Sequence, residues 1–119
     1  MISGAFWVLT LAVAAGSALA LWHLRAAEGA ARPPIVAGVA HGLIGTIGLA
    51  LLLVALRGPP RGVDAGVGSF ATVSAVLFAG ALLSGIVMLL LRRRGLLIAI
   101  HAGIAISGYM LVLAWNALG

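Results

Sequence analysis

Two histidines, His41 and His101, are the residues of this chain whose type and spacing could support chemistry. They lie in similar apolar stretches, AHGLIGTIG and IHAGIAISG, and each is followed seven residues later by a glycine. A neutral imidazole nitrogen is a common metal ligand, and a histidine inside a membrane is costly unless it has a partner. The matched pair therefore predicts a site that holds a flat cofactor between two imidazoles, with haem b as the first candidate.

Small residues share the helical face of each histidine, because positions three, four and seven residues apart lie on one side of a helix. The small residues on these two faces are Gly45, Gly48, Ala105 and Gly108. Such residues let helices approach closely, and they would also leave a slot in which a planar ring lies against the backbone. A chlorophyll-type pigment, a quinone or a bare metal ion are alternative ligands. The simplest alternative is that each histidine only bonds a carbonyl, serine or threonine in a packed interior.

The composition of the chain excludes an ordinary water-soluble domain. Of its 119 residues, 64% are hydrophobic and 8% are charged, whereas about a quarter of the residues of a soluble domain are charged. The net charge of +5 comes from arginines in short loops between apolar stretches, so no nucleic acid partner is expected. The absence of cysteine excludes disulfides, a thiolate metal site and covalent thioether attachment of haem.

Four apolar stretches are long enough to cross about 30 Å of hydrocarbon, which takes about 20 helical residues. They cover about 4–25, 35–57, 68–91 and 95–117. Backbone groups in lipid must bond internally, so these stretches are expected to be helices. The predicted fold is all-α, a single transmembrane domain over residues 1–119 built as an integral membrane four-helix bundle with up-down-up-down topology.

Arginines are concentrated in the first and third connections between these stretches: Arg25, Arg32, Arg92, Arg93 and Arg94. The positive-inside rule therefore predicts that these loops are cytoplasmic and that both termini lie outside, in a bacterial inner membrane. Both histidines would lie on the cytoplasmic side, six residues, or about 9 Å, into their helices. A haem there would direct its propionates towards Arg25 and Arg92, because arginine suits carboxylates.

The chain also divides into two halves of similar plan, each with a helix, an arginine-bearing loop and a histidine-bearing helix. An offset of 60 positions aligns His41 with His101 and Gly48 with Gly108. The halves would then be parallel repeats, related by an axis along the membrane normal. A sequence this rich in alanine, glycine and leucine also aligns with itself by chance, so both origins of the pattern stay open.

The other polar and small residues of these stretches are expected mainly to support packing. His23 lies near the end of the first helix, about one turn shallower than the pair, and is interfacial, a proton carrier, a quinone partner or a third ligand. Tyr109 is expected to form a hydrogen bond across a helix interface, and Gly16, Ser84 and Gly85 to let helices pack. No acidic residue lies within any stretch, which argues against a proton-coupled cation exporter.

The stretches AHGLIGTIGLALLLVAL and HAGIAISGYMLVLAW resemble the haem-binding helices of four-helix membrane b-type cytochromes. Similar histidines occur in the membrane anchor subunits of respiratory dehydrogenases. The resemblance implies that His41 and His101 ligate a single haem, because no histidine marks a second site near the outer side. It implies an electron-transfer protein or subunit, rather than a stand-alone enzyme, that exchanges electrons with quinone or a partner redox subunit.

Two other classes of function stay open from the sequence. One is a non-catalytic accessory or anchor subunit of a larger membrane complex, with a protein partner or further copies of itself, and with or without bound pigment. The other is a small transporter or channel, in which the histidines line a polar path. A visible spectrum separates these classes, because a bound haem or chlorin absorbs strongly and a bare scaffold or channel does not.

Overall fold

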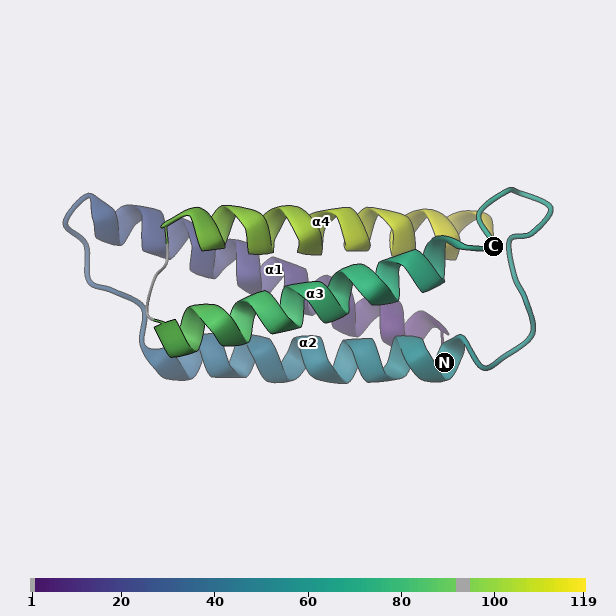
Figure 1. The fold of residues 1–119 in the computed structure, drawn as a ribbon, viewed down its shortest axis with the longest axis horizontal. Coiled ribbons are helices and arrows are strands. Elements are labelled where there is room, and N and C mark those ends of the chain that lie inside the picture. Colours follow the sequence, from purple (N-terminus) through teal and green to yellow (C-terminus); the bar gives the residue numbers. More distant parts are fainter. Residues whose placement is uncertain (1, 92–94) are drawn as a thin grey trace.

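The computed structural model describes residues 2–91 and 95–119, and its secondary structure there is entirely α-helical. The four helices are α1 (Ile2–Ala27), α2 (Ile35–Ala55), α3 (Phe70–Leu91) and α4 (Gly95–Leu118) (Figure 1). Each end lies within two residues of the stretch predicted from hydropathy. All four helices are long and apolar enough to cross a membrane, as the sequence predicts.

Glycine and proline set the boundary between α1 and α2. Gly29 has a φ of 106°, a left-handed conformation that favours glycine, and its N–H donates to the Ala26 carbonyl at 3.2 Å. Pro34 is extended, with φ −67° and ψ 150°, and directly precedes α2. A proline has no N–H to donate and disfavours helix at the residue before it, so α2 cannot extend backwards through this segment.

The helices run antiparallel to their neighbours along the chain, and each packs against two others (Figure 1). The contacts form a ring, α1 with α2, α2 with α3, α3 with α4 and α4 with α1, of which the α1–α2 and α3–α4 hairpins are the most extensive. Both termini lie at one end, which we call the terminal end. The arginine end is the opposite one, where α1 finishes and α2 begins. Consequently α2 and α4 lie diagonally and run the same way.

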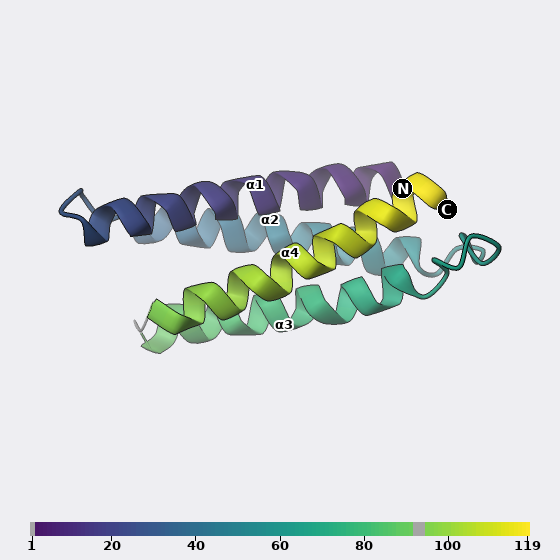
Figure 2. The ribbon, with the colours of Figure 1, turned by 90° about the horizontal axis from the view of Figure 1, so that it is seen from above.

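Buried side chains are concentrated in the half nearer the terminal end. They include Leu9, Leu52, Phe78, Val112 and Trp115. Among the described helical residues, Ala81 at the centre of α3 is the buried residue nearest the arginine end of its helix, and none is buried beyond it in that half of the bundle. Figure 2 shows the same difference in the ribbon, since the two hairpins lie close at the terminal end and diverge towards the arginine end. The interior is therefore tightly packed in one half and loosely packed in the other.

Large apolar side chains cover the outside of the helices. Leu96 is 77% exposed, and Val36, Val76 and Leu90 are also exposed. Soluble monomers rarely expose apolar surface on this scale. Together with the length of the helices, this surface indicates an integral membrane protein.

Candidate functional site

The imidazole rings of His41 and His101 meet between the two hairpins. Their centroids are 6.0 Å apart and their planes are at 81°, an edge-on arrangement. The two histidines come from the diagonal helices α2 and α4, and each lies six residues after the start of its helix. Because α2 and α4 run in the same direction, this equal register places both rings about 9 Å from the arginine end of their helices.

The centroid separation can be compared with that of two imidazoles bound to one metal ion from opposite sides. A metal–imidazole nitrogen bond is about 2 Å long, so two opposed nitrogens would lie about 4 Å apart and their ring centroids about 6 Å apart. The observed 6.0 Å agrees with that separation. Perpendicular planes are compatible with it, because each ring can turn about its own metal–nitrogen bond.

His101 is held by hydrogen bonds from one ring nitrogen to α3. Its Nδ1 lies 2.8 Å from the Ala81 carbonyl oxygen and 3.0 Å from Ser84 Oγ. Ser84 Oγ also donates to the same carbonyl at 2.8 Å. A carbonyl only accepts, so Nδ1 must carry the proton, and Nε2 is left with its lone pair. Histidines that bind a metal through one ring nitrogen usually donate the other ring N–H to a carbonyl or carboxylate in the same way.

His41 is seated against a glycine of α1. A Cβ atom added at Gly16 would lie only 2.7 Å from Cε1 and 3.2 Å from Nε2 of His41, so no other residue type fits there without movement of the ring. His41 Nδ1 is buried and has no hydrogen-bond partner among the described residues, although the backbone of Ala12 faces the ring. His101 lies less tightly against Gly85, where the corresponding distance is 3.4 Å.

The two hairpins present their histidines in the same way. Residues of α1 and α3 that are 69 positions apart have equivalent neighbours. The backbones of Ala12 and Ala81 face the imidazoles of His41 and His101, and Gly16 and Gly85 lie beside the same two rings. The order of buried, half-buried and exposed positions is identical over 12–19 and 81–88. It is also identical over 39–53 and 99–113, at the offset of 60 seen in the sequence.

The glycines predicted to border a flat cofactor divide into two groups. Gly48 and Gly108 are buried, but their space is filled by neighbouring helices: a Cβ at Gly48 would lie 2.7 Å from Leu9 Cδ2, and one at Gly108 would lie 3.2 Å from Leu77 Cβ. These two glycines therefore permit close helix packing. A Cβ at Gly45 would meet nothing within 4 Å, so that position, one turn from His41, keeps open space.

Ala105 is half-buried one turn along α4 from His101, at the position that matches Gly45. Ser74 Oγ donates to the Gly108 carbonyl at 2.7 Å and fixes the α3–α4 contact beyond it. Tyr109 makes the interhelical hydrogen bond predicted for it, with 3.0 Å between its hydroxyl and Thr10 Oγ1. These contacts close the terminal side of the histidine pair with protein.

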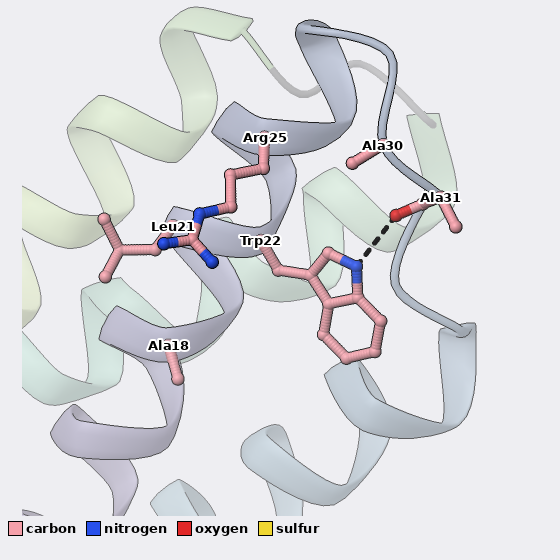
Figure 3. Close-up of a pocket in the computed structure, with 6 residues that line it drawn as sticks. All are labelled: Ala18, Leu21, Trp22, Arg25, Ala30 and Ala31. Carbon is pink, nitrogen blue, oxygen red and sulfur yellow. Dashed lines mark hydrogen bonds between the residues drawn. The ribbon is translucent and has the colours of Figure 1, made fainter.

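Arg25 does not lie near the histidine pair. It follows Gly16 by nine residues, which places it on the opposite face of α1 and about 13 Å along the axis. It lines a surface pocket of about 510 Å³, in which Trp22 Nε1 donates to the Ala31 carbonyl at 2.8 Å (Figure 3). His23, seven residues after Gly16, shares the inward face instead. Arg92, the other predicted propionate partner, lies outside the described residues.

Residues on α1 and α3 that sequence reasoning assigned only to packing therefore belong to the site. Gly16, Ser84 and Gly85 each contact a histidine ring. The signal available in the sequence was a small-residue face on each of these helices, but no periodicity within one helix shows which glycine lies opposite which histidine.

No family model, no curated protein and no solved structure matches the chain. In the described part of the chain, no three His, Cys, Asp or Glu side chains are grouped to hold a metal ion. A bare zinc ion takes four ligands, of which His41 and His101 would supply two. A metal that brings its own macrocycle would need only two protein ligands, which is the number of histidines in this pair.

Proposed function

We propose that the protein is a small membrane b-type cytochrome whose single haem is held between the two hairpins by His41 and His101. The observation that carries the proposal is the pair of imidazoles 6.0 Å apart on diagonal helices. The fixed tautomer of His101 and the glycine beneath the ring of His41 support it. A bound haem would supply one-electron transfer, which no side chain of this site supplies alone.

The residues of the chain hold and orient the two ligands. Ala81 and Ser84 keep the proton of His101 on Nδ1, which makes its Nε2 a better donor. Gly16 sets the position of the His41 ring against α1. The half on the arginine side holds fewer buried side chains, and its apolar residues would exclude water from a bound macrocycle. Gly45 and Ala105 flank the rings on the terminal side.

The proposal includes an up-down-up-down bundle inserted in a bacterial inner membrane, with the arginine end in the cytoplasm. The site lies about 9 Å from that end of a core about 30 Å thick. Electrons would therefore be exchanged with a quinone or partner subunit on that side, and one haem alone would leave most of the membrane uncrossed.

A reduced-minus-oxidised visible spectrum of the purified protein tests the proposal. We expect sharp α and β bands and one haem per chain by extraction as the pyridine complex. His41→Ala and His101→Ala should each lose the bands, and His23→Ala is the matched control, because it removes an imidazole from the same inward face two turns from Gly16. A protein that stays colourless after expression with excess haem and after reconstitution would refute the proposal and favour an accessory subunit or a channel. Chlorin absorbance would identify a pigment-binding protein.

A further inference from the structure

The surface pocket at the arginine end lies on the face of α1 that points away from the histidine pair (Figure 3). Its volume is about 510 Å³, and it lies between the last turns of α1 and the loop that follows. The indole of Trp22 lines it, and the 2.8 Å hydrogen bond from Trp22 Nε1 to the Ala31 carbonyl fixes the loop to the helix. The remaining apolar lining residues are all small or exposed: Ala18, Leu21 and Ala30. The pocket is therefore open on the side of the bundle that would face lipid.

Among the described residues, Arg25 is the only charged one that lines this pocket. Its side chain runs back along α1 towards Leu21 (Figure 3), and its guanidinium forms no hydrogen bond or ion pair with another described residue. Neither acidic residue of the chain, Glu28 or Asp64, lines the pocket. A guanidinium has five donors and no acceptor and stays charged, and a charge that faces lipid without a partner is costly. The pocket therefore presents a positive charge that needs an anion from outside the described part of the chain.

The position of Arg25 along α1 matches the depth of lipid phosphates. The helix has 26 residues and is therefore about 39 Å long, which exceeds a hydrocarbon core of about 30 Å. Its last turn, which contains Arg25, reaches the headgroup layer when the apolar middle of the helix spans the core. Trp22 lies one turn earlier, at the level where aromatic side chains mark the membrane interface. Leu21 is 60% exposed on the same face and would contact acyl chains.

We propose that this pocket binds one anionic phospholipid, with its phosphate on Arg25 and an acyl chain along Leu21 and Ala18. Arginine matches the oxygens of a phosphate through paired hydrogen bonds, and the apolar lining suits a hydrocarbon chain. Arg25 and Arg32 outnumber Glu28 over residues 25–32, and this net positive charge favours an anionic headgroup over a zwitterionic one. A quinone would not neutralise Arg25, because its carbonyls carry no charge.

Native mass spectrometry of the whole protein, released from maltoside micelles, counts the lipids that stay bound. We expect one dioleoyl phosphatidylglycerol per chain at saturation and weaker binding of dioleoyl phosphatidylcholine. Arg25→Gln should weaken phosphatidylglycerol binding about tenfold or more, as expected for loss of a charged hydrogen-bond partner. Arg32→Gln is the matched control, because it removes the same charge from an exposed residue of the same loop that does not line the pocket. Its effect should be clearly smaller.

The shape of the pocket can be tested by the same measurement. Ala18→Leu fills part of its space, whereas Ala14→Leu places the same side chain one turn away, on an exposed residue that does not line it. Only Ala18→Leu should weaken binding, by about fivefold or more, because it overpacks the bound lipid. His41→Ala should leave lipid binding unchanged, since Arg25 lies on the face of α1 opposite to Gly16. Loss of haem and loss of lipid are therefore separate results.

Three outcomes would overturn the proposal: equal affinities of Arg25→Gln and Arg32→Gln, lipid adducts that increase without saturation, or equal binding of phosphatidylglycerol and phosphatidylcholine. A quinone analogue that displaces the lipid, and whose own binding survives in Arg25→Gln, would assign the pocket to a quinone instead. Circular dichroism of each variant verifies that it is folded.

Discussion

Replacement of Gly16 by alanine tests the contact that positions His41. The added Cβ would lie 2.7 Å from His41 Cε1, whereas carbon atoms pack favourably at about 3.5–4.0 Å. The imidazole must therefore move by roughly 0.8 Å, or the two helices must separate, to restore an ordinary contact. Either movement changes the 6.0 Å spacing between His41 and His101 or the packing of α1 against α2.

The size of the effect follows from a matched comparison with Gly45→Ala. Both substitutions replace a glycine inside a helix, so the gain in helix propensity, about 1 kcal/mol, is common to both and cancels. A Cβ at Gly45 meets nothing within 4 Å, so only the Gly16 variant overpacks the interior. Overpacking typically costs about 1–3 kcal/mol. We therefore expect Gly16→Ala to be less stable than Gly45→Ala by about 1–3 kcal/mol.

The free energy of unfolding can be measured by titration of mixed micelles with a denaturing detergent, followed by circular dichroism. Haem titration of the same variants reports the geometry of the site, and we expect affinity to fall about tenfold or more in Gly16→Ala, because a shift of about 1 Å in a positioned group can cost that much. Gly85→Ala should resemble the Gly45 control, since its Cβ would lie 3.4 Å from His101. Equal stability of the Gly16 and Gly45 variants, together with a haem affinity of Gly16→Ala equal to that of the unsubstituted protein, would refute the reasoning, because they would show that His41 is not held against α1.

Three further substitutions test other contacts. Gly48→Ala should destabilise the protein by about 1–3 kcal/mol, because its Cβ would lie 2.7 Å from Leu9; the loss should shrink in a Leu9→Ala background, and additive effects would contradict the assigned contact. Tyr109→Phe should cost about 0.5–1.5 kcal/mol by the same detergent titration, and a double-mutant cycle with Thr10→Val should show coupling if the 3.0 Å hydrogen bond forms. Ser84→Ala should lower haem affinity about 10-fold in a haem titration while the protein stays folded, whereas unchanged affinity would assign Ser84 to packing alone.

The helices could be predicted from the sequence because each one is a long apolar stretch bounded by strong breaks. Pro33 and Pro34 mark the start of α2, and Gly29 ends the turn after α1. Their ends lie within two residues of the prediction. The equal depth of His41 and His101 also follows from the sequence, because each lies six residues into its helix and the two helices run in the same direction.

Contacts between helices could not be predicted in the same way. The periodicity of a helix shows which residues share a face, but the axial position of its neighbour depends on loop lengths and on the packing itself. The sequence predicts only that Gly48 and Gly16 allow close approach of helices. The structure shows that Leu9 fills the space beside Gly48 and that His41 fills the space beside Gly16. Arg25 illustrates the same limit: the sequence predicts that it lies at the arginine end of α1, but not that it lines a surface pocket away from the histidine pair.

The repeat is visible in sequence only for α2 and α4, because α1 and α3 align at a different offset. At 69 positions, Ser84 on α3 corresponds to Ala15 on α1, and both are half-buried. The two histidines therefore differ in one neighbouring hydroxyl: Ser84 Oγ lies 3.0 Å from Nδ1 of His101, in addition to the Ala81 carbonyl at 2.8 Å, whereas Ala15 offers His41 no hydroxyl.

Ala15→Ser should supply that hydroxyl if the hairpins are equivalent at the level of side chains. We expect it to be more stable than Ala14→Ser by about 0.5–1.5 kcal/mol, the usual contribution of one hydrogen bond. Ala14 is the matched control, because it is exposed on the same turn and carries the same loss of helix propensity. His41→Ala should abolish the difference between the two serine variants. If Ala15→Ser is no more stable than Ala14→Ser, the two hairpins share only their pattern of burial, and the contacts of His41 cannot be inferred from those of His101.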